Sequence, residues 1–351
     1  MKGFVIGGVG LILLLVFTNA CKPDPPIDQD LVEMELEVPN GFPRAIVPED
    51  NPVTQAKIDL GKKLFYDRLL SRDRDLNCAS CHFPEHAFAD PRRLSVGHGG
   101  ATGTRNAPPL FNLMYHQEFF WDGANPTLET QTLFPIESDF EMNLSIGELV
   151  DRLNADPEYP AMFERVFNDS ITPRGIVQAI ATFERTMISG GSKYDDFVAA
   201  GFDSTLFTPQ EWRGYQLFFM ETADGKHAEC FHCHGGFNFD DPEGRYRNNG
   251  LYLDYEDEGR YLVTGDDRDR GKFKVPSLRN IEHTAPYMHD GSLATLEEVM
   301  EHYATGGQLH QNRDLLMSNI ELDSSQQAEI IAFLKTLSDP DFMTNPAFLP
   351  E

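Results

Sequence analysis

Two short motifs of cysteine and histidine carry the clearest chemistry in this sequence. Both have the pattern C-x-x-C-H, at residues 78–82 and 230–234. Two thiols at this spacing add to the two vinyl groups of one haem, and the adjacent histidine then reaches the iron as its proximal ligand. The pattern therefore predicts two covalently attached haems of the c type. The residues that would hold them are Cys78, Cys81, His82, Cys230, Cys233 and His234.

Other uses of these four cysteines fit the pattern less well. Exported proteins often pair their cysteines in disulfides, and a C-x-x-C pair can also be a redox dithiol. A zinc site can combine two such pairs. None of these requires a histidine directly after each pair. Haem attachment accounts for both histidines.

The fifth cysteine, Cys21, follows what reads as an export signal in residues 1–20. Lys2 supplies a positive charge, residues 4–17 are apolar apart from glycines, and residues 18–20 are small or polar. This is the pattern of a secretory signal peptide. A cysteine directly after it resembles the lipobox of bacterial lipoproteins, in which the thiol is acylated. An uncleaved membrane anchor is the alternative, because the apolar run is at the short limit for spanning a bilayer. Both interpretations predict a protein tethered on the periplasmic side of the cell envelope.

Length and charge limit the possible partners. The chain has 351 residues, enough for about two domains, and a formal net charge of −27. Such an acidic balance argues against nucleic-acid binding, which needs a basic face. It fits a basic protein partner, because opposite charges attract two proteins and speed their association. It equally fits an acidic surface that only keeps the protein soluble.

The organisation of the chain suggests two similar units after an extended segment. Residues 22–52 are rich in proline and acids and predict an extended tether. Gly61 and Gly214 are each followed three residues later by Leu-Phe, and they precede the two cysteine pairs by 17 and 16 residues. We expect a mainly α fold with long irregular loops and two cytochrome c-like haem domains, at residues 53–204 and 205–345.

Start signals mark the predicted helix before the second motif. Thr208 is the expected N-cap, Pro209 stands at the first helical position, and Glu211 completes a capping box. Trp212 falls on the apolar face of this helix, and we expect it to be a core residue. A closing amphipathic helix is expected from Ser324.

The loops between and after the haem motifs resemble those of the bacterial di-haem cytochrome c peroxidases, a family that includes the MauG-type enzymes. The resemblance extends from about residue 53 to 340 and depends on the order and spacing of several motifs. These are SVGHG (95–99), TRNAP (104–108), FWDG (120–123), LETQ (128–131), EM (141–142), KVPSLRN (274–280) and TAPYMHDG (284–291).

The resemblance implies that peroxide reacts at the first haem. Glu141 matches the family's distal acid–base residue, and a positioned carboxylate of this kind speeds proton transfer about 10² to 10⁴-fold. Gln131 matches its neutral hydrogen-bonding partner. His98 matches a histidine that ligates the first iron in one redox state and leaves it in another; the alternative is an ordinary loop histidine. Trp121 matches the residue between the two haems, although a lone tryptophan is also typical of a core.

The resemblance also implies a calcium ion at the domain interface. Calcium takes oxygen ligands, including side-chain amides and backbone carbonyls. The family's ligand positions match Asn106, Thr284 and Pro286.

One position departs from the typical peroxidases of the family. They carry a methionine ligand to the second iron fourteen residues after the histidine of the His-Asp-Gly motif, where this chain has Tyr303. MauG-type enzymes have a tyrosine there. Met300 lies one turn earlier on the same predicted helix, which begins after Thr295, and it is the alternative ligand. A tyrosine oxygen is a harder ligand than methionine and favours ferric iron.

The leading prediction is therefore a peroxidase that reduces hydrogen peroxide with electrons from a small c-type cytochrome. A MauG-type oxidase, which acts on a protein substrate through a high-valent haem pair, is the second hypothesis, and Tyr303 supports it. A non-enzymatic electron carrier or redox sensor is the third, and the Gln131 and Glu141 positions argue against it. Members of the family are often dimers, so the resemblance allows a homodimer, although no residue of the sequence indicates one.

Overall fold

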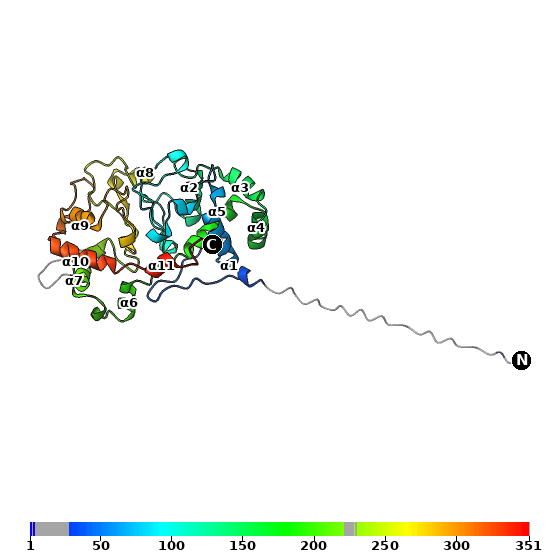
Figure 1. The fold of residues 1–351 in the computed structure, drawn as a ribbon, viewed down its shortest axis with the longest axis horizontal. Coiled ribbons are helices and arrows are strands. Elements are labelled where there is room, and N and C mark those ends of the chain that lie inside the picture. The colour runs from blue at the N-terminus through cyan, green and yellow to red at the C-terminus, as the bar shows by residue number, and fades with distance from the viewer. Residues whose placement is uncertain (2, 4–27, 221–227, 229, 351) are drawn as a thin grey trace.

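The computed structural model describes Met1, Gly3, residues 28–220, Ala228 and residues 230–350. The predicted export signal and Cys21 lie outside the described residues. The chain forms one body of helices joined by long loops (Figure 1), which confirms the expected mainly α class. The α-helices are α1 (Gln55–Tyr66), α2 (Leu128–Glu137), α3 (Ile146–Asn154), α4 (Tyr159–Phe167), α5 (Pro173–Arg185), α6 (Lys193–Ala199), α7 (Pro209–Phe219), α8 (Tyr261–Thr264), α9 (Leu296–Ala304), α10 (Ser324–Lys335) and α11 (Pro340–Thr344).

Two helix pairs explain the internal repeat seen in the sequence. Helix α1 packs against α5, and α7 packs against α10. A Cβ added at Gly61 would lie 2.0 Å from the carbonyl oxygen of Ala179, and one added at Gly214 would lie 1.9 Å from that of Glu329. Each glycine therefore lets two helices cross with their backbones in contact, once in each half of the chain.

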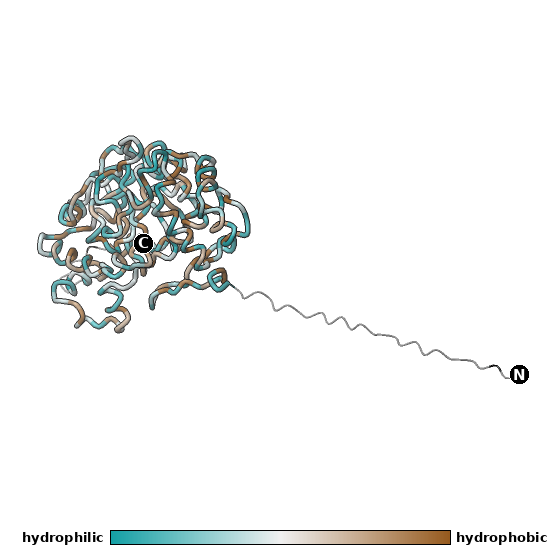
Figure 2. Tube along the Cα trace, turned by 45° about the vertical axis from the view of Figure 1, so that its right-hand side comes forward, coloured by the Kyte–Doolittle hydropathy of each residue, from teal (hydrophilic) through white to brown (hydrophobic). Residues whose placement is uncertain are grey.

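The buried apolar side chains form two clusters. The first is built mainly from α1 to α5 and the loops that follow the first cysteine pair, and it includes Phe65, Phe88 and Phe183. The second is built from α6, α7, α9 and α10 and includes Phe333. In Figure 2, short hydrophobic and hydrophilic stretches alternate along the trace in both halves. The C-terminal segment returns to the first cluster, because Phe342 packs there.

The predicted helix starts are confirmed. Thr208 caps α7 and Glu211 completes a capping box with it, as Thr295 and Glu298 do for α9. Asp323 caps α10 directly before Ser324. In each case a side-chain oxygen accepts from backbone N–H groups that the first helical turn leaves without a partner.

The described part of the proline-rich segment, residues 28–52, is largely extended, but it lies against the body instead of standing free. The ring of Phe42 packs edge-on against Phe237, with 4.8 Å between the ring centroids, and the guanidinium of Arg279 lies 4.7 Å from the Phe42 centroid. Tyr115 donates from its hydroxyl to the carbonyl oxygen of Pro43 at 2.9 Å. Aromatic burial therefore attaches this segment to residues of both halves.

Strands contribute little. The antiparallel pair β1 (Tyr246–Arg247) and β2 (Phe273–Lys274) places Tyr246 opposite Lys274. Among the described residues, no helix is long and apolar enough to cross a membrane.

Candidate active site

The first C-x-x-C-H motif begins in a single 3₁₀ turn, Cys78–Ser80. Asn77 and Ser80 form a capping box that fixes this turn. The Nδ1 atom of His82 lies 2.8 Å from the carbonyl oxygen of Phe88. A hydrogen bond to a carbonyl places the ring proton on Nδ1 and leaves Nε2 as the atom able to bind a metal. Burial lowers the pKa of His82, so that the ring is held in the neutral form that a ligand requires.

The second motif repeats this arrangement. It begins in the turn Cys230–His232, and the Nδ1 atom of His234 lies 3.2 Å from the carbonyl oxygens of both Phe239 and Pro276. Burial lowers the pKa of His234 to about 4. The ring is therefore neutral at pH 7, with Nε2 available to a metal. None of the four described cysteines is in a disulfide.

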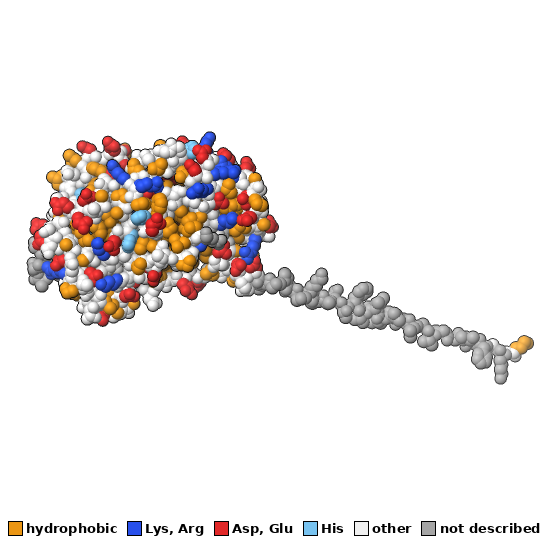
Figure 3. Space-filling model, viewed as in Figure 1, with side chains coloured by type: hydrophobic (Ala, Val, Ile, Leu, Met, Phe, Trp, Pro, Cys, Tyr) orange, Lys and Arg blue, Asp and Glu red, His pale blue; other side chains and the backbone are white. Residues whose placement is uncertain are grey.

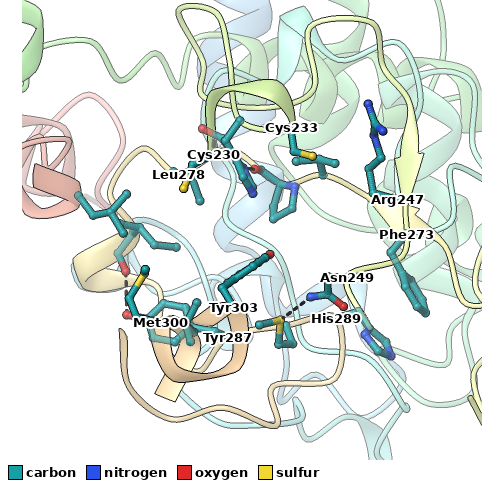
Figure 4. Close-up of a pocket in the computed structure, with 18 of the residues that line it drawn as sticks. Cys230, Cys233, Arg247, Asn249, Phe273, Leu278, Tyr287, His289, Met300 and Tyr303 are labelled. Atoms are coloured by element: carbon teal, nitrogen blue, oxygen red, sulfur yellow. Dashed lines mark hydrogen bonds between the residues drawn. The ribbon is translucent and has the colours of Figure 1, made fainter. Parts of the chain in front are cut away.

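A cavity of about 210 Å³ opens beside the second motif (Figure 4). Its walls are mostly apolar, as expected for a cofactor site. The chemistry of its lining fits a haem group attached through two thiols and one imidazole. The lining includes Cys230, Cys233 and His234 of the motif, together with Met288, Met300 and Tyr303.

Tyr303 and Met300 both line this cavity, but they occupy different places in it. In Figure 4 the phenolic oxygen of Tyr303 reaches into the middle of the cavity, whereas Met300 lies toward the wall beside Tyr287. Only 4% of Met300 is exposed, and it belongs to the second apolar cluster. Asn249 lies beside Tyr303, and its side-chain amide donates to the sulfur of Met288 at 3.2 Å.

Glu141 lies beside the first motif. Its carboxyl interacts electrostatically with the thiols of both Cys78 and Cys81, and burial raises the pKa of Glu141 to about 7. The residue after it donates from its backbone N–H to Pro135 at the end of α2, the helix that carries Gln131. The structure therefore brings the expected acid and the helix of its expected amide partner to the same place.

The loop of His98 contacts this acid directly. The backbone N–H of His98 donates to the carbonyl oxygen of Glu141 at 2.7 Å. The Nδ1 atom of His98 lies 3.2 Å from Oδ2 of Asp73, within ion-pair distance of that carboxylate but not aligned for a hydrogen bond. A Cβ at Gly97 would lie 2.0 Å from the carbonyl oxygen of Phe140, so only glycine permits this approach.

Trp121 lies where the two halves meet. Its indole N–H donates to the carbonyl oxygen of Asn106 at 2.9 Å, and its own carbonyl accepts from the backbone N–H of Lys274 at 2.7 Å. Trp121 and Asn106 both line the cavity of the second motif, together with Thr284 and Pro286. The three residues expected to bind calcium therefore all line the same cavity. Among the residues that the structure describes, no cluster of three or more His, Cys, Asp or Glu side chains could hold a metal ion, so a cation here would depend on amide, hydroxyl and carbonyl oxygens.

Several known proteins resemble this chain over most of its length. A sequence profile of the family described as di-haem cytochrome c peroxidase matches residues 55–202. The methylamine utilization protein MauG of Methylorubrum extorquens is 35% identical over 335 residues, which cover 91% of this chain and 88% of that protein. The cytochrome c551 peroxidase of Nitrosomonas europaea is 36% identical over 307 residues, which cover 85% of this chain and 84% of that protein. The chain belongs to the di-haem cytochrome c peroxidase family.

Solved structures agree with this assignment. A crystal structure of a MauG-like protein associated with microbial copper homeostasis superposes with a TM-score of 0.83 at 38% identity, covering 89% of this chain and 98% of that one. The diheme peroxidase BthA from Burkholderia thailandensis shares the fold, with a TM-score of 0.69 at 22% identity. The match covers 89% of this chain and 94% of that one. As a member of the di-haem family, the chain is a haem-containing oxidoreductase with two haem c groups.

Several polar residues of the site had no signal in the sequence. His116 lies between the two halves and contacts the side chain of Lys274, although nothing in its sequence surroundings distinguishes it. Asn249 and Glu184 were likewise not predicted. Lys274 stands in the KVPSLRN motif, which was noted only as part of the family resemblance.

Proposed function

We propose that this chain reduces hydrogen peroxide to water at the site of the first motif, with electrons that a small c-type cytochrome delivers through the site of the second. The balance is one peroxide, two electrons and two protons for two water molecules. Bound haem iron would supply the redox chemistry at both sites. The residues of this chain bind and orient the substrate and move the protons.

Glu141 carries the proposal. A general acid–base residue must accept a proton from one peroxide oxygen and give it to the oxygen that leaves as water. A carboxyl whose pKa is raised to about 7 by burial is suited to both steps at neutral pH, because neither form is strongly favoured. An exposed glutamate would remain a carboxylate and would be a poor proton donor.

Gln131 would hold the substrate beside this acid. Its amide donates hydrogen bonds but takes up no proton, so it orients peroxide without competing with Glu141. It lies on α2, whose last turn is bonded to the Glu141 segment. We propose that His98, on the loop bonded to Glu141, is a reversible ligand of the first iron.

Trp121 would connect the two sites. It is hydrogen-bonded to both halves of the chain, to Asn106 in the first half and to Lys274 in the second. We propose that its indole relays electrons, and that Asn106, Thr284 and Pro286 bind calcium next to it.

We further propose export, acylation of Cys21 and a periplasmic location. Lys and Arg are interspersed among the acidic side chains on the face shown in Figure 3, so the negative charge of that face is spread over the surface.

A second candidate function follows from Tyr303. Its oxygen, and not the sulfur of Met300, reaches into the middle of the second cavity. A tyrosine ligand would stabilise the oxidised iron. This arrangement favours a MauG-type oxidase that acts on a protein substrate.

The stoichiometry of turnover separates the two functions. The protein without residues 1–21, loaded with both haems, is mixed with hydrogen peroxide and a pre-reduced small cytochrome c. The peroxidase proposal predicts rapid turnover with about two cytochromes oxidised per peroxide. Slow or absent oxidation of the cytochrome, with a long-lived spectral change after peroxide alone, would contradict it and favour the protein oxidase.

A further inference from the structure

A loop of the first half reaches into the second half and carries Trp121. We call residues 116–123 the Trp121 loop. Tyr246 on β1 donates from its hydroxyl to the carboxylate of Glu118, in the middle of the loop. Arg260 donates to the carbonyl oxygens of Asp122 and Gly123 at 2.9 and 3.1 Å. Residues of the second half therefore contact the loop along its length.

Lys274 contacts this loop at two separated points. Its backbone N–H donates to the carbonyl oxygen of Trp121 at 2.7 Å, and its ammonium donates to Nδ1 of His116 at 3.0 Å. The two loop residues are five positions apart. Lys274 lies on β2, opposite Tyr246 of β1, so its backbone is fixed by strand pairing. One residue of the second half therefore holds the beginning of the Trp121 loop and the tryptophan itself.

The ammonium contact belongs to a partly buried polar cluster. The side chain of His116 is 13% exposed, and its Nε2 lies 3.7 Å from Oδ2 of Asp240. An ammonium group can only donate, so Nδ1 of His116 must accept, and the ring proton must then be on Nε2, toward Asp240. Asn238 is 1% exposed and donates to Asp240 at 2.8 Å. Nε2 of His116 also lies 3.4 Å from the side-chain nitrogen of Asn238. Lys274, His116, Asn238 and Asp240 thus form one polar cluster across the interface.

Removing a lysine ammonium from water costs free energy unless hydrogen bonds or ion pairs compensate. Burial lowers the pKa of Lys274 to about 8, while Asp240 and Glu118 act in the opposite direction. Burial lowers the pKa of His116, and the positive charge of the nearby Lys274 lowers it further. An apolar side chain of similar length would avoid this desolvation. It would keep the backbone bond to Trp121 but would lose the bond to His116.

We propose that Lys274 is a positioning residue for electron transfer between the two haem sites, because its bond to His116 holds the Trp121 loop in one place. The proposal rests on the proposed relay role of Trp121. The rate of a transfer depends on the placement of the groups that take part, so an indole that is free to move is a poorer relay. Loss of the His116 contact would let the loop move while both haem attachment motifs stay intact.

The test uses the protein loaded with both haems and compares four variants with wild type. Lys274→Met removes the ammonium and keeps the backbone N–H. Lys274→Arg restores a donor to His116. His116→Phe removes the acceptor from the other side. Lys272→Met is the matched control, because Lys272 lies two residues earlier and its ammonium lies 3.4 Å from Oδ1 of Asp269, which is outside the Trp121 loop.

Two readouts are measured. Rapid mixing with a reductant that enters at the second haem gives the rate at which electrons reach the first haem. Redox titration gives the potential of each haem. We expect Lys274→Met and His116→Phe to slow the transfer severalfold, because the indole would no longer be held in one place. The potentials should change too little to account for the slower transfer, Lys274→Arg should recover most of the rate, and Lys272→Met should match wild type.

A Trp121→Phe variant separates failure of this inference from failure of the proposed relay. If Trp121→Phe is slow but Lys274→Met and His116→Phe transfer at the wild-type rate, Lys274 is not a positioning residue and the relay stands. If Trp121→Phe itself is fast, the relay is wrong. A shift in haem potential large enough to account for the slower transfer would also overturn the inference, since the effect would then be one of charge. If Lys274→Met does not mature with haem, His116→Phe decides alone.

Discussion

The backbone N–H of His98 donates a hydrogen bond of 2.7 Å to the carbonyl oxygen of Glu141. This bond joins the two residues of the first site that change their bonding in the proposed reaction. One is the expected reversible iron ligand and the other is the acid–base residue. A movement of the His98 loop would therefore shift the backbone of Glu141, and in the proposed reaction it would couple release of the iron ligand to the placement of the acid.

The close approach at Gly97 allows the first prediction. A methyl group at this position would lie 2.0 Å from the carbonyl oxygen of Phe140, so Gly97→Ala must move the His98 loop away from Glu141. We expect the rate of reaction with peroxide to fall on the order of ten- to a hundredfold, measured by rapid mixing. Gly103→Ala is the control, because a Cβ there meets nothing within 4 Å. Equal rates for both variants would show that the contact is unimportant.

The pKa of Glu141 predicts the pH dependence of catalysis. Burial raises this pKa from 4.5 to about 7, and the carboxylate form must be present to accept the first proton. Thus kcat/KM for peroxide should increase as the pH rises through about 7 and then level off. Glu141→Gln should remove this step from the profile. A profile that rises instead near pH 4.5 would mean that the acid is not buried in the working enzyme.

Glu184 predicts a pH dependence of stability. It is 5% exposed, one carboxyl oxygen has no hydrogen-bond partner, and burial raises its pKa to about 8. A pKa raised in the folded state contributes stability that is full below the unfolded value of about 4.5 and is lost as the pH rises through about 8.

Replacement of Glu184 by Gln should therefore help more at high pH. We expect the variant to gain about 1 to 3 kcal/mol relative to wild type on going from pH 5 to pH 8. Thermal unfolding of the haem-loaded protein at both values measures this. Glu164→Gln, at an exposed position of α4, should show no such trend. A constant difference between Glu184→Gln and wild type would mean that Glu184 is ionised throughout.

The two candidate ligands of the second iron are distinguished by substitution. Tyr303→Phe should change the visible spectrum and raise the potential of the second haem, because it removes a hard oxygen ligand that favours ferric iron. Met300→Leu keeps the volume of a side chain that is 4% exposed and should change stability by less than about 1.5 kcal/mol with no spectral effect. The reverse pattern would assign the ligand to Met300.

Much of this architecture could be predicted because it depends on local chemistry. The C-x-x-C-H spacing is a covalent requirement, and the caps Thr208 and Thr295 satisfy backbone donors within three residues, so no tertiary information was needed. Gly61 and Gly214 were visible as a repeat, but the helix crossings that require them were not. Those crossings depend on Ala179 and Glu329, more than a hundred residues away.

The interface could not be predicted from its own residues. His116 and Asp240 come from different halves, and each is an ordinary loop residue in the sequence. Likewise, the acids and prolines of residues 28–52 predict an extended chain, but the attachment of Phe42 to Phe237 and Arg279 depends on a surface formed only after folding. Pairings of this kind arise from the tertiary fold and leave no periodic signal.

The most direct test of the proposed peroxidase compares wild type with Glu141→Gln in the haem-loaded protein without residues 1–21. Oxidation of a pre-reduced small cytochrome c is followed after addition of hydrogen peroxide. Asp139→Asn, at an exposed acid two residues earlier, is the control. We predict rapid turnover in wild type and the control, and a loss of about 10² to 10⁴-fold in Glu141→Gln. Turnover that survives in Glu141→Gln would contradict the assigned acid–base residue, and no turnover in wild type would contradict the peroxidase function itself.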